Sequence, residues 1–429
     1  MQTIDLSDPR NVIEVLRKGK MLDHPGVAAH VRFALATNDY SQLMGFLKAN
    51  PAIIATALNN IAAEEFEKSL SPFRPYPTIK EVNEYLTGPL TFGYVNPARS
   101  MFGILWDILC LPILCAGRTG SGKSSLIKSM ISKIISMQLP FNILIPDLKK
   151  EYRHLCTDGT NLKVLMQDRI MLNPLQVPAW CTRIEDHVVA FSKCFVSENY
   201  LVGTSENVLI DLVDSLYRSR GIYAESKNYP TLKDLYDLVT RSLSKAKSFR
   251  WMDVLLWLQN RLRPYVLCDS FNCQIGIPFE TFQKENLVLE MDTRFTDRMY
   301  NFTIATIANQ LYMHNKAKDI GGTIKHWWVV DEARILFNAH RDVSAFGESV
   351  LTEILTKSRA YGISFLLASQ ESASFNSVMR SLSFLKIAFP LSDCADLDFI
   401  KASFGLTEEQ KDALFELPAY GTAVVRYGG

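Results

Sequence analysis

The chain has 429 residues, of which 48% are hydrophobic and 21% are charged, and this composition excludes a disordered protein. The length predicts either one large domain with an appendage or two domains. The net charge of +1 provides no overall attraction to nucleic acid, so a DNA partner would have to be held by local basic patches.

The sequence predicts neither a signal peptide nor a transmembrane segment of its own. Its most apolar window, residues 101–117, contains Asp107 and Pro112 and is shorter than the ~20 residues that span a bilayer. The 8 cysteines show neither a C-x-x-C motif nor paired metal-ligand spacing, which argues against a structural zinc site. We therefore expect a cytoplasmic protein that reaches the inner membrane, if at all, through partners.

The N-terminal part of the chain, residues 1–76, is typical of helices. Ile54, Leu58 and Ile61 form an apolar stripe at helical spacing, and three prolines within residues 71–77 indicate a linker. We assign residues 1–87 to a mainly helical N-terminal module that includes this linker.

From residue 88 onward, apolar runs of strand length alternate with helical patterns, which predicts an α/β domain with a mostly parallel sheet at 88–429. Most of the runs are uninterrupted, as expected of strands covered on both faces. Residues 180–270 lack strand patterns and predict a helical insertion within this domain. The expected strands are 112–117, 141–147, 286–292, 326–332, 363–369, 385–391 and 421–427.

The segment "GRTGSGKSS" matches the phosphate-loop pattern G-x-x-x-x-G-K-[ST], with an apolar strand before it and a helical pattern after it. Glycines let backbone N–H groups curl around an anion, and the following helix adds its free N–H groups. Lys123 is expected to reach the β and γ phosphates of ATP, and Ser124 to bind Mg²⁺. The expected nucleotide-binding residues of this loop are Gly117, Arg118, Thr119, Gly120, Ser121, Gly122, Lys123, Ser124 and Ser125.

The segment "HWWVVDEA" carries Asp331 to the C-terminal end of a strand, where open α/β sheets bind ligands. We expect Asp331 to hold Mg²⁺ and Glu332 to polarise the attacking water. Taken alone, an apolar run that ends in Asp-Glu is equally well explained by a helix N-cap.

Two further segments follow expected strands. In "PDLKKEY", Asp147 and Glu151 are expected near the same crevice, although a solvated helix start is the simpler explanation. In "IMLNPLQ", residues 170–176, a strand end precedes Asn-Pro, which by itself indicates only a turn.

The segment "KSRAYGISFLLASQ", residues 357–370, has Arg359 before an apolar strand and Gln370 after it. Together with "GRTGSGKS", "DLKKEY", "LNPL" and "VVDEA", it resembles the HerA/FtsK superfamily of hexameric pumping ATPases, which includes HerA-type translocases, conjugative coupling proteins and type IV secretion ATPases. The motifs occur in the family's order over residues 88–429. The resemblance implies a RecA-like core and a homohexameric ring, with each nucleotide held between neighbouring subunits.

The resemblance also implies roles for the two ends of residues 357–370. Arg359 would stabilise the transferring phosphoryl group in the adjacent subunit's site, with Arg334 and Arg380 as weaker candidates. Gln370 would sense the γ-phosphate or orient water, at the end of a strand beside the phosphate-loop strand. The strand that ends at Asp331 is likewise expected to neighbour the phosphate-loop strand.

The N-terminal module departs from the family, because coupling proteins begin with membrane helices, secretion ATPases have larger N-terminal domains and HerA-type translocases begin with a small β-barrel. The chain also ends at Gly428-Gly429, directly after the last expected strand, which suggests that a C-terminal tail is missing.

The leading functional prediction is an ATP-hydrolysing motor that threads double-stranded DNA, or a DNA–protein conjugate, through a central pore. The alternatives are an ATPase that energises type IV-like protein secretion or assembly, and the ATPase subunit of a DNA-processing or defence complex with a partner nuclease. Arg341, in the loop 338–347, is the first candidate for a DNA contact in the pore, and Arg294 and Arg298 are less specific candidates.

Overall fold

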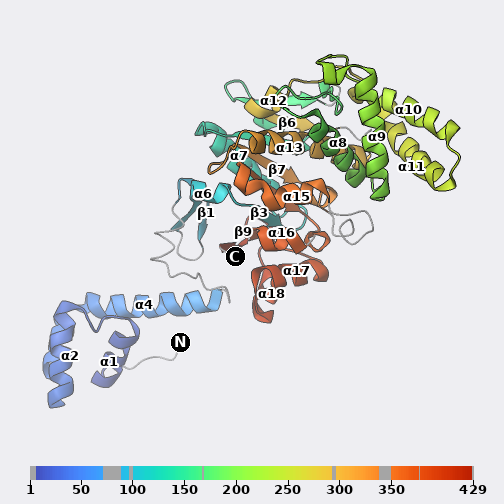
Figure 1. Cartoon of the computed structure of the whole chain (residues 1–429). Coiled ribbons are helices and arrows are strands. Elements are labelled where there is room, and N and C mark those ends of the chain that lie inside the picture. The colour runs from blue at the N-terminus through green and yellow to red at the C-terminus, as the bar shows by residue number, and fades with distance from the viewer. Residues whose placement is uncertain are drawn as a thin grey trace. The chain divides into compact units, whose positions relative to one another are not determined.

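The computed structural model describes residues 6–70, 88–95, 100–166, 169–291, 296–337, 349–375 and 377–427. The chain forms two compact units, residues 1–76 with 95–99 and residues 77–94 with 100–429 (Figure 1). Each unit has its own hydrophobic core. No helix in these ranges is both long enough and apolar enough to cross a membrane.

The N-terminal unit is helical. Proline stands at the start of the first two helices, where its missing N–H group costs nothing, and the Asp8 carboxylate caps the first helix by accepting from Arg10 N at 2.8 Å. Val12, Leu16 and Leu43 are fully or almost fully buried in a small core. The helices are α1 (Pro9–Lys18), α2 (Pro25–Thr37), α3 (Ser41–Ala49) and α4 (Pro51–Leu70).

The larger unit is built on an 8-stranded sheet with the order β10-β9-β3-β8-β7-β4-β6-β5. All neighbouring pairs are parallel except β10 with β9, which is antiparallel. This arrangement confirms the expected α/β fold with a mostly parallel sheet. The strands are β3 (Ile113–Ala116), β4 (Asn142–Asp147), β5 (Leu162–Met166), β6 (Asn286–Glu290), β7 (His326–Asp331), β8 (Ile363–Ser369), β9 (Leu385–Ala388) and β10 (Val424–Tyr427).

The apolar runs of the sequence are strands covered on both faces, as expected. Every residue of β8 is buried, and Phe365 and Leu367 share one core with Leu351 and Ala308 from two covering helices. These helices and the other described α-helices of the unit that lie outside residues 180–270 are α6 (Trp106–Leu109), α7 (Lys123–Ser136), α12 (Phe279–Lys284), α13 (Asp297–Ala317), α15 (Val350–Lys357), α16 (Ser377–Leu382), α17 (Cys394–Phe404) and α18 (Glu408–Phe415).

The expected helical insertion is present as four helices, coloured green to yellow-green in Figure 1. Thr231 and Asp234 form a reciprocal capping box at the start of the third of these helices. Leu209, Leu235 and Leu258 from three different helices are fully buried in the same core. The helices are α8 (Ile184–Glu198), α9 (Thr204–Ser219), α10 (Leu232–Lys245) and α11 (Phe249–Val266).

The structure corrects two expectations and adds three strands. Residues 170–176 are not a strand end, because the strand is β5, several residues earlier. The strands that end in Asp331 and in the phosphate loop are not neighbours, because β8 pairs with both β3 and β7 and lies between them. Neither β5 itself nor the separate two-stranded sheet of β1 (Leu90–Val95) and β2 (Ser100–Ile104) was predicted from the sequence.

Candidate nucleotide-binding site

The phosphate loop connects β3 to α7 and depends on glycine conformations. Gly117, Gly120 and Gly122 have φ angles of +155°, +76° and +112°, which side-chain-bearing residues rarely adopt. A Cβ atom on Gly117 would lie 2.5 Å from the Cβ of Phe389, in the segment after β9. The loop therefore needs glycine at residue 117 both for its backbone angle and for its contact with Phe389.

The loop is supported from the β9 and β10 side of the sheet. Arg118 N donates to Pro390 O at 2.9 Å, just after β9. Gly421 N, in the turn before β10, donates to Ser121 O at 3.0 Å. These bonds fix the loop's backbone to the segments next to β9 and β10, which come from the C-terminal part of the sequence.

Lys123 is buried at the start of α7, with 5% of its surface exposed. Its ammonium group donates to the carbonyl oxygens of Gly117 at 2.5 Å and Arg118 at 3.1 Å, so it lies inside the curl of the loop. Burial lowers its pKa below the usual lysine value.

Ser124, the next residue of α7, approaches Asp331 across the sheet. Its hydroxyl donates to Asp331 Oδ2 at 3.3 Å, and the Tyr152 hydroxyl donates to the same oxygen at 3.0 Å. Burial raises the pKa of Asp331, although the Tyr152 hydrogen bond opposes that rise. A hydroxyl and a carboxylate that meet at the start of the phosphate-loop helix are oxygen donors of the kind that Mg²⁺ takes, so these residues fit that metal.

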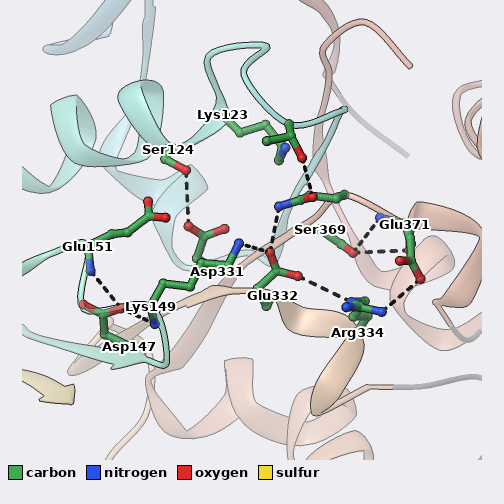
Figure 2. Close-up of polar contacts among 12 residues, drawn as sticks. Lys123, Ser124, Asp147, Lys149, Glu151, Asp331, Glu332, Arg334, Ser369 and Glu371 are labelled. Carbon is green, nitrogen blue, oxygen red and sulfur yellow. Dashed lines mark hydrogen bonds and ion pairs between the residues drawn. The ribbon is translucent and has the colours of Figure 1, made fainter. Parts of the chain in front are cut away.

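Glu332 follows β7 in a left-handed backbone conformation, with φ of +81°, and only 6% of it is exposed. Its carboxylate accepts a hydrogen bond from Gln370 Nε2 at 2.9 Å and forms an ion pair with Lys149 (Figure 2). The Nε atom of Arg334 lies 3.5 Å from the same carboxylate. Although Glu332 precedes a short 3-10 helix, its side chain makes no capping hydrogen bond. The N-cap explanation for the Asp-Glu pair therefore does not apply.

Gln370 links Glu332 to the phosphate loop. Its amide donates to Glu332 through Nε2, and its Oε1 accepts from the Thr119 hydroxyl at 2.6 Å. Gln370 directly follows β8, which lies between β3 and β7. The position of β8 therefore lets one amide contact both the loop and the candidate water-polarising residue.

Asp147 lies at the same edge of the sheet, but its carboxylate is hydrogen-bonded to the backbone of the loop that follows it. Its carboxylate accepts from the backbone N–H groups of Lys149 at 3.1 Å, Glu151 at 3.2 Å and Tyr152 at 2.9 Å. Glu151 lies 3.7 Å from the Lys128 ammonium. The segment is a carboxylate-braced loop that leads into a short 3-10 helix, Arg153–Leu155, and the bracing positions Lys149 and Tyr152 toward Glu332 and Asp331.

Arg359 lies at the opposite edge of the sheet from the phosphate loop. It belongs to a short 3-10 helix, Ser358–Tyr361, at the amino end of β8, and its side chain is exposed. Gln370 stands at the other end of β8, and seven residues at about 3.3 Å each separate the two by roughly 20 Å. Arg359 therefore cannot reach the nucleotide-binding site of the same chain.

The other arginines considered from the sequence have different surroundings. Arg334 contacts Glu332 and lies 3.1 Å from Glu371. The Arg380 guanidinium lies 5.9 Å from the centre of the Phe399 ring, and that of Arg298 lies 5.3 Å from the Tyr200 ring. Arg294 and Arg341 lie outside the described residues.

The Asn-Pro segment does more than make a turn. The Asn173 amide is buried and donates to Pro230 O at 3.0 Å and Gln274 O at 2.8 Å, while its Oδ1 accepts from Leu175 N at 3.0 Å. These bonds tie residues 170–176 to the helical insertion and to the segment that follows it.

Lys149 and Tyr152 are the site residues that sequence reasoning missed. Both lie within the "DLKKEY" segment, so the motif was visible, but only the acidic residues were considered as ligands. Their contacts depend on β4 pairing directly with β7, which places the two strand ends together.

Comparisons with known proteins agree with this fold. Residues 113–257 match the family model described as the central domain of the helicase HerA. VirB4 of Thermoanaerobacter pseudethanolicus shares 18% identity with a TM-score of 0.59, over 76% of this chain and 91% of that one. The resemblance to the HerA/FtsK ATPases is confirmed.

The bacterial plasmid coupling protein TrwB, solved with a non-hydrolysable ATP analogue, is also similar to this chain. It shares 13% identity with a TM-score of 0.54, over 84% of this chain and 93% of that one. TrwB has also been solved with ADP and Mg²⁺, with a TM-score of 0.53 and 14% identity over 79% of this chain and 86% of that one. A search of curated proteins found no match by sequence. The structural likenesses establish the RecA-like fold of the larger unit.

Proposed function

We propose that this chain is an ATP-hydrolysing ring motor that translocates double-stranded DNA, or a DNA–protein conjugate, through a central pore. The observation that carries the proposal is the hydrogen-bonded contact of Thr119, Gln370 and Glu332 beside Lys123, Ser124 and Asp331. The groups proposed to bind phosphate, to hold the metal and to polarise water thus come from three neighbouring strands and meet at one edge of the sheet.

Within one subunit, the phosphate loop would hold the ATP phosphates through its backbone N–H groups and Lys123. Ser124 and Asp331 would hold Mg²⁺, which when bound neutralises charge on the phosphates. Glu332 would orient and deprotonate the attacking water, and Gln370 would respond to the γ-phosphate through its contacts with Thr119 and Glu332.

Arg359 would complete the site of the neighbouring subunit. An exposed guanidinium far from its own phosphate loop is suited to this task, since it can be delivered across an interface to the transferring phosphoryl group. Hydrolysis would then depend on assembly of the ring, with six copies as the family resemblance implies.

The proposed DNA contact does not require a basic protein. In a symmetric ring, a few Lys or Arg side chains per subunit are repeated around the pore and bind phosphates without reading sequence. The net charge of +1 is therefore compatible with a DNA substrate.

The test is to measure ATP hydrolysis with and without duplex DNA over protein concentrations that span assembly. We expect specific activity to rise steeply with concentration and to increase further with DNA, more strongly at low salt. Specific activity that is independent of concentration would contradict the shared site. Assembly-dependent activity without DNA binding or stimulation at low salt would instead support the ATPase of a protein secretion or assembly system.

A further inference from the structure

The exposed tyrosine beside the phosphate loop has no part in the proposed hydrolysis chemistry. Tyr420 is 64% exposed and belongs to the turn before β10. Its hydroxyl lies 3.3 Å from Ser125 Oγ, in the first turn of α7. The neighbouring residue Gly421 donates to Ser121 O at 3.0 Å, so this turn is fastened directly to the loop.

The order of the strands indicates in which direction a bound nucleotide would extend from the phosphate loop. β3, which leads into the phosphate loop, has β8 and β7 on one side and β9 and β10 on the other. Glu332 and Gln370, which would act at the γ-phosphate, come from the β7 and β8 side. A nucleoside triphosphate with its γ-phosphate toward these residues extends its nucleoside end away from them, toward the β9 and β10 side.

The first turn of α7 indicates the same direction for the bound nucleotide. Lys123 is expected at the β and γ phosphates and Ser124 at the metal, so the backbone that follows them lies toward the α-phosphate. Ser125 is that next residue, and it is exposed beside the Tyr420 hydroxyl. Two independent features thus place Tyr420 where the sugar and base leave the phosphate loop.

We propose that Tyr420 is the platform on which the base of the bound nucleotide stacks. The inference rests on the proposed function, since it assumes that the loop binds a nucleoside triphosphate. An aromatic ring offers a flat apolar face to a planar base, and the hydroxyl contact with Ser125 tethers that ring to the phosphate site. Purines, with the larger stacking surface, are the favoured bases, and the exposed ring has room to accept them.

The experiment measures by calorimetry the binding of three probes, namely ATP, CTP and inorganic tripolyphosphate, each with Mg²⁺. We expect Tyr420→Ala to bind ATP roughly tenfold more weakly, because stacking on an aromatic ring is lost. Tripolyphosphate, which has no base, should bind as it does to the unchanged protein. The preference for ATP over CTP should shrink, and Tyr420→Phe should keep the affinity for ATP because it keeps the ring.

Each other outcome overturns the proposal in a distinguishable way. Equal weakening of ATP and tripolyphosphate would mean that Tyr420 shapes the loop, and unchanged ATP binding would mean that the base lies elsewhere. Weakening by Tyr420→Phe as large as that by Tyr420→Ala would assign the effect to the hydroxyl. Tyr94→Ala, which removes a similarly exposed tyrosine from β1, is the matched control and should change nothing. Wild-type ATP binding by Lys123→Ala would refute the proposed function itself.

Discussion

The amide of Gln370 donates a hydrogen bond of 2.9 Å to Glu332 and so joins the ends of β8 and β7. Because the same amide accepts a bond from Thr119, it contacts the phosphate loop and the candidate water-polarising carboxylate at once. A group in this position can transmit the presence of a γ-phosphate to Glu332 through two hydrogen bonds.

The first prediction concerns this amide. Gln370→Ala should leave ATP affinity within a few-fold of the unchanged protein and lower turnover roughly a hundredfold, because Glu332 loses an orienting partner. Binding and single-turnover measurements separate the two effects. Thr119→Val, which removes the loop hydroxyl, should give a smaller loss of the same kind, while Thr119→Ser should be active. Turnover of Gln370→Ala at the wild-type rate would show that the hydrogen bond from Gln370 to Glu332 is not needed for hydrolysis.

The second prediction compares two adjacent lysines. Both lysines are exposed, but Lys149 pairs with the buried Glu332, whereas Lys150 has no ion pair within the described residues. Lys149→Met should lower turnover at least roughly tenfold, since the carboxylate loses its closest cation, and Lys150→Met should have no such effect. Because the Lys149 side chain is 42% exposed, unfolding in urea should show a stability loss below about 1 kcal/mol. A large stability loss would indicate that Lys149 acts on the fold and not on Glu332.

The third prediction is a pH profile for kcat/KM with an acidic and an alkaline limb. Burial raises the pKa of Asp331 above 3.8 and lowers the pKa of Lys123 below 10.5. Metal binding needs the Asp331 carboxylate ionised and phosphate binding needs Lys123 charged. The acidic limb should therefore lie above pH 3.8 and the alkaline limb below pH 10.5. Limbs at or outside these two values would contradict the assignment of the two groups.

The pH dependence of stability gives an independent check of the raised pKa of Asp331. Because the pKa in the folded protein is raised, folding disfavours the ionised carboxylate at neutral pH. Asp331→Asn should thus increase the free energy of unfolding at pH 7, and the increase should shrink as the pH falls toward 3.8. An increase that does not vary with pH would mean that the carboxylate's ionisation is not its cause.

The fourth prediction compares two glycines of the phosphate loop. Both have positive φ, but a Cβ on Gly120 would meet nothing within 4 Å, whereas one on Gly117 would lie 2.5 Å from Phe389 Cβ. Gly120→Ala should cost about 1 kcal/mol of stability for its backbone angle, and Gly117→Ala about 3 kcal/mol or more. Urea unfolding midpoints at unchanged slope measure both values. Equal losses of stability in the two variants would show that Phe389 moves away from the new Cβ atom without a cost in free energy.

The fifth prediction tests whether Arg359 acts across an interface. Arg359→Ala and Lys123→Ala should each be almost inactive in ATP hydrolysis when assembled alone. A mixture of the two should recover part of the activity, because some interfaces then combine an intact phosphate loop with an intact arginine. Arg380→Ala, whose guanidinium lies near Phe399, is the control and should remain active. Failure of the mixture to recover activity, with mixed assembly demonstrated, would place Arg359 outside the neighbouring site.

The fold was largely predictable because the strands of a doubly covered sheet are continuous apolar runs. β5 was missed because it lies at the sheet edge and is only partly buried, and because Lys163 interrupts its apolar pattern. The order of the strands was not predictable from such runs, since apolar patterns show that a strand is buried and not which strand lies beside it.

The phosphate loop was predictable because its glycines and lysine are dictated by local geometry. The contacts of Glu332 were not, because they depend on side chains that reach it from the ends of two other strands. Lys149 reaches it because β4 pairs with β7, and Gln370 because β8 does. The spacing of these residues in the sequence does not indicate that their side chains meet.

The pairing of β3 also bears on how the protein is made. Ile113 pairs with Leu366 on one side and with Leu385 on the other, so both hydrogen-bonded neighbours of the phosphate-loop strand are synthesised long after it. Contacts so distant in sequence form slowly, and a nascent chain that has reached the helical insertion still has an unpaired β3. The motif that appears early in the sequence would thus be among the last parts of the sheet to fold.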